Sequence, residues 1–441
     1  MISLSTKAKV YPFTTNNQLE LLPDPYASKD LKLELVRKAK HHIHIMTYFW
    51  DKSTFPTELA HELNLAHERG VEVRIISTFF PSFVTDIFQK AKKNLKLKSK
   101  NPNTVFSYLP LKLYDGLTFT NNIHEKLFLI DSEVAIIGGR NIADSALRGK
   151  DMEVLIKGEL VNQAQDHFKI MFDFISHLKS KSECETTSKK SAKIEKSKQC
   201  LQSIEKTKFL TQDENYFKNY DQVEVGFTKA RLLTHEAIIK QFENKYNPIE
   251  RAKMPDDILD TIVNTTDFKT VRTYNYFILP TERYMDFLVK SKKENKEVRI
   301  ITNGLEAATF SSNKGYLFGI SYMQKLLKEN VDIYQWKKNP HGNNKETYIH
   351  AKVLTFDDDH GFIGSHNLGF GSTMSSNEMA VEFFDTEIVK ELNNVFDHET
   401  STETITTKAT PKLLSGEALE YEWNIKILKS ESIENFLKEL Y

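Results

Sequence analysis

Two α/β lobes related by a pseudo-twofold axis, each a mixed sheet flanked by helices, are the fold that the sequence predicts. The first observation is a repeated pattern of His-x-Lys, an Asp five residues after the Lys, a Gly-containing turn and an Asn, which begins at His124 and again at His350. The second is its register, because the two histidines are 226 positions apart and so are Asn141 and Asn367. An internal duplication explains both. The third is that helical and strand-like segments alternate in each copy.

The first copy begins with residues 28–41, which have helical spacing. They lead into residues 42–50, an apolar, β-branched and aromatic segment that is typical of a buried strand. A second helical stretch ends at Gly70, a residue suited to a helix terminus, and is followed by a strand at residues 71–78.

The second copy repeats this order with a helix at 256–266, a strand at 268–279, a helix through Tyr284 and Phe287, and a strand at 297–303. Each copy also contains a pair of short strands joined by an acidic turn, at 127–139 and 352–365. Two such lobes bring equivalent residues face to face, so we expect the active site at their interface.

A Lys/Ser/Glu-rich stretch at residues 179–208 separates the two copies and contains almost no large apolar residues. It indicates either a solvated linker or an exposed, partly helical insertion. We therefore predict an N-terminal lobe over residues 1–178 and a C-terminal lobe over residues 209–441. Cys184 and Cys200 both fall in the linker, where free thiols are expected rather than a disulfide framework.

The composition is that of a soluble globular protein, with 40% hydrophobic and 27% charged residues. Lys plus Arg and Asp plus Glu number 60 each, so there is no global positive field to attract nucleic acid, and no nucleic-acid partner is expected. No run approaches the roughly 18 apolar residues that span a bilayer, and the N-terminus lacks the apolar core of a secretory signal. We expect a protein that is cytoplasmic or peripheral on a membrane.

The spacing within each repeat suits the binding of an anion. Residues i and i+2 of a strand project from the same face, so His124 and Lys126 should point into one cavity, as should His350 and Lys352. If the lobes pack about their twofold axis, two imidazoles and two ammonium groups converge on a site for a tetrahedral anion. The alternative is that both histidines are ordinary core residues on strand faces. Two matches in the same register make that alternative much less attractive.

Histidine is the side chain best suited to act near neutral pH as a nucleophile in one copy and a general acid in the other. A phosphodiester offers non-bridging oxygens that the lysines, Asn141 and Asn367 would hold. A nucleophilic imidazole also needs an acceptor on its other nitrogen.

Carboxylates stand at matching positions downstream of the two motifs. Asp151 and Glu378 are 227 positions apart, and we predict that they orient the histidines, with ordinary surface carboxylates as the alternative. Asp131 and Asp357 follow each histidine by seven residues, so alternation directs them to the opposite face, where a structural role is expected.

With its duplicated His-Lys-Asp motif, the sequence resembles the phospholipase D superfamily, and within it bacterial cardiolipin synthases. The resemblance covers both lobes and includes HEKLFLIDSEVAIIGGRNIADS, VRIITNGLEAA and HAKVLTFDDDHGFIGSHNLGFGSTMSSNEMAVEF. It implies a two-step reaction without metal or cofactor through a phosphohistidine, with His124 as nucleophile and His350 as leaving-group acid. The substrate it implies is a glycerophospholipid cleaved on the head-group side.

The sequence also departs from the family. LGFGSTMSS follows Asn367 where Arg-Ser is frequent, and Ala146 stands where an aromatic residue is common. These differences leave the acceptor open: water would give phosphatidic acid, and a small alcohol would give a new phospholipid. Two other functions remain as alternatives, namely a nuclease or other phosphodiesterase of the same superfamily and a catalytically inactive lipid-binding effector.

Two segments bear on membrane contact and export. Residues 79–100 combine an apolar helical face with many lysines, which indicates either a helix on an anionic membrane surface or an ordinary packed helix. The polar stretch 398–412 is expected to be a loose connection, followed by a short strand and a helix. An acidic, Ser-rich C-terminus also occurs on exported bacterial effectors, although a packing role is the favoured interpretation.

Overall fold

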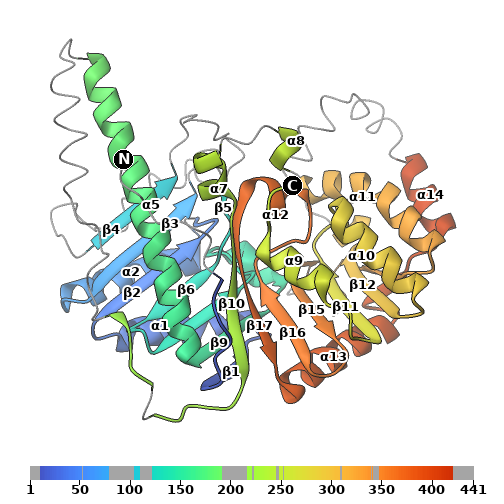
Figure 1. Cartoon of the computed structure of the whole chain (residues 1–441), viewed down its shortest axis with the longest axis horizontal. Coiled ribbons are helices and arrows are strands. Elements are labelled where there is room, and N and C mark those ends of the chain that lie inside the picture. Colours follow the sequence, from blue (N-terminus) through green and yellow to red (C-terminus); the bar gives the residue numbers. More distant parts are fainter. Residues whose placement is uncertain are drawn as a thin grey trace.

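The computed structural model of the chain places its first half beside its second half, coloured blue to green and yellow to red in Figure 1. The residues that the structure describes are 10–51, 53–78, 104–109, 122–190, 216–220, 223–244, 248–251, 253–307, 310–338, 340 and 347–420.

The described part of the first half forms a seven-stranded mixed sheet in the order β1-β9-β7-β6-β2-β3-β4. Strands β2, β3 and β4 run parallel, and the neighbouring pairs on the β1 side are antiparallel. Its strands are β1 (Asn17–Leu21), β2 (His42–Thr47), β3 (Glu72–Thr78), β4 (Thr104–Leu109), β6 (Leu127–Ile130), β7 (Val134–Gly138) and β9 (Glu153–Gly158).

The second half repeats this order as β10-β17-β16-β15-β11-β12-β13, with β18 added at the edge of its described sheet. Its strands are β10 (Lys229–Glu236), β11 (Thr270–Asn275), β12 (Glu297–Asn303), β13 (Asp332–Trp336), β15 (Val353–Phe356), β16 (His360–Gly364), β17 (Ser376–Phe384) and β18 (Thr406–Lys408). The predicted fold class, a duplicated α/β unit with mixed sheets flanked by helices, is therefore confirmed.

Helices cover the outer face of each sheet and fill the space between the two. On the first half, α1 (Pro25–Lys38) and α2 (Thr54–Glu68) bury Leu33, Val36 and Leu63 against the sheet. The outer helices of the second half are α9 (Asp257–Asn264), α10 (Glu282–Lys293) and α11 (Phe310–Lys328), with α7 (Ala237–Asn244), α8 (Pro248–Arg251), α12 (Phe370–Ser375) and α14 (Pro411–Glu420) around them. Apolar burial stabilises each lobe.

A third hydrophobic core joins the halves. It contains residues of both sheets together with helices α5 (Glu159–Lys190) and α13 (Thr386–Ser401), whose Phe168 and Phe396 are almost completely buried. Because α5 also contacts β10 of the other sheet, the two halves share one continuous apolar interior.

Short strands are exchanged between the halves. β5 (Asn122–Ile123), from the first half, pairs in parallel with the start of β17, and β14 (Tyr348–Ile349), from the second, pairs in parallel with β8 (Gly149–Lys150). The backbone N–H of His124 donates to Asn377 O at 2.9 Å, and that of His350 to Lys150 O at 2.7 Å. Each motif histidine is thus anchored to the opposite half.

Two sequence expectations need correction. Residues 124–126 are not part of a regular strand but connect β5 to β6. Residues 398–412 are not a loose connection, because they include the end of α13, strand β18 and the start of α14. Helix α5 continues to Lys190, so the described part of the stretch 179–208, including Cys184, is helical, which fits the partly helical alternative.

Other sequence interpretations lie outside what the structure describes. These are the segment 79–100, residues 191–208 with Cys200, and the C-terminal residues 421–441. The proposed domain boundaries at 178 and 208 stay a prediction. Within the described residues, no helix has the length and apolar character to span a membrane.

Asp131 and Asp357 hold the turns between the paired short strands. The carboxylate of Asp131 accepts hydrogen bonds of 2.8 Å from the backbone N–H groups of Lys40, His41 and His42, and Asp357 accepts from two N–H groups at the start of β11, those of Lys269 and Thr270. Both residues have a positive φ, of 53° and 47°, so the local backbone depends on these contacts.

Replacing Asp131 with Ala should therefore destabilise the fold by about 2 kcal/mol, because buried backbone donors lose their acceptor. Thermal unfolding would measure the effect. Glu133→Ala is the matched control, since its exposed ion pair with Lys218 should contribute less than about 1 kcal/mol. An Asp131→Ala protein as stable as the wild type would contradict this role.

Candidate active site

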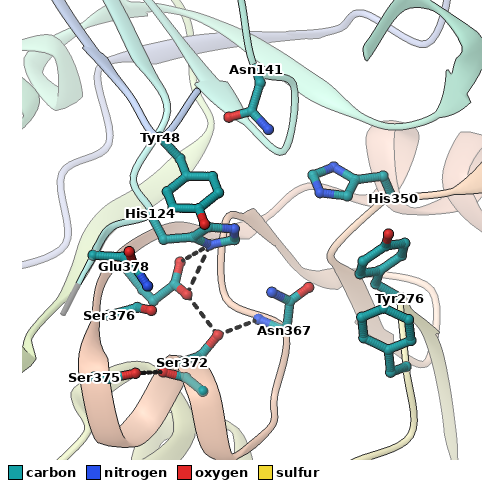
Figure 2. A pocket seen from close by; sticks show the side chains of 13 residues that line it. Tyr48, His124, Asn141, Tyr276, His350, Asn367, Ser372, Ser375, Ser376 and Glu378 are labelled. Carbon is teal, nitrogen blue, oxygen red and sulfur yellow. Dashed lines mark hydrogen bonds and ion pairs between the residues drawn. The ribbon is translucent and has the colours of Figure 1, made fainter. Parts of the chain in front are cut away.

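A cavity of about 270 Å³ lies between the two halves, where the exchanged strands meet. Its wall is made by residues from both motifs, as Figure 2 shows. The lining residues are Tyr48, Asn122, His124, Asn141, Tyr276, Phe277, His350, Asn367, Gly371, Ser372, Ser375, Ser376 and Glu378. The structure thus brings both histidines and both asparagines of the repeated motif to one cavity.

Each histidine is oriented by a carboxylate from the other half. Nδ1 of His124 lies 2.9 and 3.0 Å from the two oxygens of Glu378, and Nδ1 of His350 lies 2.7 Å from Asp151. Because an ionised carboxylate only accepts, both rings carry their proton on Nδ1. Nε2 of each neutral ring is then left with its lone pair available.

The motif lysines lie beside the cavity rather than in its wall. Nζ of Lys126 donates to the carbonyl oxygen of His124, and Nζ of Lys352 donates to that of His350. Both side chains are almost fully buried. The alternation of side chains along a strand predicted that each histidine and its lysine would point into the same cavity. Because the segment between them is not a regular strand, each lysine instead turns back toward the backbone of its own histidine.

One tyrosine completes each half of the site. The ring of Tyr48 lies 5.1 Å from the His124 ring, and Tyr276 lies 5.1 Å from His350, in both cases near edge to face. The corresponding lysine ammonium lies 5.6 or 5.4 Å from the same tyrosine ring. Sequence reasoning missed both tyrosines, although they are 228 positions apart and the register of the duplication could have found them.

The two carboxylates have different surroundings. Glu378 accepts hydrogen bonds from the hydroxyls of Ser365 and Ser372, at 2.5 and 2.6 Å. Gly139 stands where Ser365 would be expected in the first copy, and a Cβ there would lie 2.3 Å from Asp151. Asp151 instead accepts from the backbone N–H of Met152. The serines also escaped the sequence analysis, because they have no counterpart in the first copy.

Among the described residues, no group of three or more His, Cys, Asp or Glu has an arrangement that could hold a metal ion. Asp131 and Asp357, the remaining members of the motif, are at the strand turns described above rather than in the cavity wall. The arrangement can present two neutral imidazoles, each backed by a carboxylate, to one small anionic group.

Comparison with known families agrees with this geometry. A family model described as "Cardiolipin synthase, PLD-like domain", where PLD denotes phospholipase D, matches residues 33–172 and 258–400. The chain belongs to the phospholipase D superfamily. Each match covers one half of the internal repeat and includes one histidine of the cavity.

The similar curated proteins, two of them named cardiolipin synthases, are distant in sequence. A cardiolipin synthase of Oceanobacillus iheyensis is 22% identical over 407 residues, covering 90% of this chain and 71% of that protein. Cardiolipin synthase 2 of Staphylococcus epidermidis is 23% identical over 393 residues, with coverages of 87% and 68%. An uncharacterized protein of Helicobacter pylori is 23% identical over 406 residues, with coverages of 86% and 78%.

Among solved structures, the phosphatidylserine synthase of Haemophilus influenzae superposes with a TM-score of 0.64. The alignment covers 98% of this chain and 97% of that one, at 13% identity. This similarity supports the fold of the phospholipase D-like protein along its whole length.

Burial controls the protonation of the site. It lowers the pKa of His124 to about 4 although Glu378 opposes the change, and together with Lys352 it lowers the pKa of His350 to about 3. Burial alone would raise the pKa of Glu378, but its hydrogen bond to His124 and the nearby His366 and Lys126 hold it at about 2. At neutral pH the empty site of this superfamily member therefore contains neutral imidazoles and ionised carboxylates.

The lysines of the site respond to burial in the same direction. Burial lowers the pKa of Lys352 to about 8, and it lowers the pKa of Lys126 well below its ordinary value although Glu378 and Asp151 oppose this. An anion entering the cavity would favour the charged form of both ammonium groups.

Acid should destabilise this protein through its two cavity histidines. Their unfolded-state pKa is about 6.5, so between that pH and about pH 4 the unfolded chain binds more protons, and stability falls as the pH falls. Replacing His124 or His350 with Asn should reduce the proton uptake on unfolding by about one per histidine. Urea denaturation across this pH range would measure it, with the exposed His41→Asn as control. Equal pH slopes in wild type and variants would contradict the assignment.

Proposed function

We propose that the protein is a phosphatidyltransferase of the phospholipase D type, which cleaves the head-group side of a glycerophospholipid through a phosphohistidine. The observation that carries this proposal is the cavity with two neutral imidazoles, each bonded through Nδ1 to a buried carboxylate. Family membership and the cardiolipin synthases among the relatives support the lipid substrate.

In the first step, Nε2 of His124 uses its lone pair to attack the phosphorus atom. The N–P bond forms while the P–O bond to the head group breaks, and His350 donates a proton to the departing alcohol oxygen. The ring of His124 becomes positively charged, and Glu378 stabilises that charge through Nδ1–H. The phosphatidyl group is then held on His124.

In the second step, the reaction runs in the opposite sense. An acceptor hydroxyl gives its proton to the now neutral His350 as its oxygen attacks phosphorus, and the N–P bond breaks to restore His124. Water as acceptor gives phosphatidic acid, and an alcohol gives a new phospholipid. Asp151 orients His350 in both steps.

His350 must carry a second proton when the substrate is bound, because it acts as the acid of the first step. His350 is neutral in the empty cavity because its pKa is about 3, so it takes up a proton when the anionic phosphodiester enters. Asn141 and Asn367, which line the cavity, offer amide donors to the non-bridging oxygens, and Lys126 and Lys352 add positive charge from behind the tyrosines.

The size of the cavity fits the polar part of a phospholipid. A volume of about 270 Å³ is near the lower limit of small-molecule sites, roughly 300 Å³, and suits a phosphodiester with a small head group. The two acyl chains would then remain outside, in a membrane against which the protein binds peripherally.

Purified protein mixed with phosphatidylglycerol vesicles should release phosphatidic acid or a transfer product, identified by mass spectrometry with and without added glycerol. His124→Ala and His350→Ala should each reduce turnover by at least about 10³-fold, as loss of a catalytic group does. His41→Ala, which changes an exposed histidine, should retain full activity.

Parallel incubations with DNA and RNA distinguish the other functions. Cleavage of nucleic acid alone would overturn the lipid substrate, and lipid binding without any turnover would indicate an inactive effector.

An aryl phosphodiester such as bis(p-nitrophenyl) phosphate tests which histidine is the nucleophile. Its leaving group needs little protonation, so His350→Ala should still give a burst of one p-nitrophenol per enzyme and a phosphorylated His124. His124→Ala should give neither. A burst in His124→Ala, with phosphate on His350, would reverse the two roles.

A further inference from the structure

The two asparagines of the cavity are held in different ways. Oδ1 of Asn141 accepts a hydrogen bond from the backbone N–H of Phe49, and the next residue, Ile142, donates its N–H to Phe49 O. No described hydrogen bond holds the side chain of Asn367, whose Oδ1 is buried without a donor. The position of Asn367 therefore depends on its backbone.

That backbone makes an unusual turn directly after Asn367. Leu368 has a φ of 55°, a conformation that a leucine adopts only when other contacts compensate. The compensating contact is local, because the N–H of Leu368 donates to Nδ1 of His366 at 2.9 Å. This hydrogen bond joins the residues immediately before and after Asn367, so His366 stabilises the turn.

A buried carboxylate sets the proton on His366. Oδ2 of Asp256 lies 2.9 Å from Nε2 of His366 and accepts from the hydroxyl of Thr373 at 2.8 Å, while Oδ1 caps α9 through the N–H of Leu259. Asp256 is fully buried, and His366 is 4% exposed. Since Asp256 is an acceptor, Nε2 carries the proton and Nδ1 is free to accept from Leu368.

We propose that Asp256 and His366 form a positioning pair that presents Asn367 to the cavity by keeping Nδ1 of His366 unprotonated beneath the Leu368 turn. The pair touches no substrate and acts only through Asn367. It has no equivalent in the first copy, where Arg140 stands at the position of His366 and binds Glu153 and the carbonyl oxygens of Leu22 and Pro23.

The positioning pair makes one side of the cavity sensitive to acid. A second proton on His366 would place Nδ1–H against the N–H of Leu368, which removes the hydrogen bond that holds the turn. Four charged or titratable groups act on this ring: Asp256, Glu378, Arg283 and His235. Burial alone would lower the pKa of His366, but the attraction of Asp256 reverses this and raises the pKa above that of an ordinary histidine.

Two substitutions of His366 test the roles of its two ring nitrogens separately. In His366→Asn, Oδ1 replaces Nδ1 as acceptor for Leu368 and the contact with Asp256 is lost. In His366→Gln, the amide replaces Nε2 and the acceptor for Leu368 is lost. Asp256→Asn would donate to Nε2 and move the histidine proton to Nδ1, with the same consequence for the turn.

Calorimetric binding of sulfate, a tetrahedral anion of constant charge between about pH 5 and 8, tests the pair without lipid turnover. His366→Asn should keep the wild-type affinity at pH 8 although its melting temperature falls. His366→Gln and Asp256→Asn should bind sulfate roughly tenfold more weakly, as expected for one lost hydrogen bond. As the pH falls, protonation of the cavity lysines and histidines favours sulfate in both proteins, so the acid response of the pair should appear as a fall in the sulfate affinity of the wild type relative to that of His366→Asn.

Asp385→Asn is the matched control, because Asp385 caps α13 through Oδ1 and hydrogen-bonds to no histidine among the described residues. It should leave sulfate binding unchanged. The proposal is overturned if His366→Asn and His366→Gln weaken sulfate binding equally, or if Asp256→Asn binds as the wild type does.

The tautomer can be read independently of any ligand. ¹⁵N-histidine spectra of wild type minus His366→Asn should show an Nε2-protonated ring at pH 8, and an Nδ1-protonated ring would exclude the pair. If sulfate does not bind even the wild type, the cavity assigned under the proposed function is at fault, and these spectra alone decide the pair.

Discussion

Each cavity histidine hydrogen-bonds through Nδ1 to a carboxylate from the opposite half of the chain, and the rest of the site depends on this exchange. The exchanged strands β5 and β14 make the pairing possible, because they bring the backbone of each histidine alongside the strand that leads to its carboxylate. Burial then keeps both rings neutral, whereas the contacts of Glu378 and Asp151 with the histidines and with nearby positive groups outweigh burial and keep both carboxylates ionised. Neither half alone contains a histidine together with the carboxylate that orients it.

The two copies of the repeat differ in the residues that surround the cavity groups. The chemical groups of the cavity are duplicated, but their supports are not. Glu378 is held by serine hydroxyls, whereas Asp151 lies against Gly139 and a backbone N–H. The two copies therefore share the groups that line the cavity, while the residues that hold those groups in place differ between them.

The sequence predicted the two lobes and most site residues because an in-register repeat constrains many positions at once. It could not predict the crossed pairing, since Asp151 and Glu378 match in position but their partners depend on strand contacts between the halves. Lys126 and Lys352 do not lie where the sequence predicted, because side chains alternate in this way only along regular strands and residues 124–126 do not form a strand. Ser372 had no counterpart to reveal it, because the first copy has Ala146 at the equivalent position.

The exchange of β5 and β14 also indicates a route by which such a protein could evolve. Reciprocal donation of a strand and a carboxylate is the contact pattern of an isologous dimer, in which two identical subunits complete each other's centre. Joining the subunits into one polypeptide preserves that reciprocity and removes the concentration dependence of assembly. It would also let the two halves diverge, as the proposed division of attack and proton transfer between the two imidazoles requires.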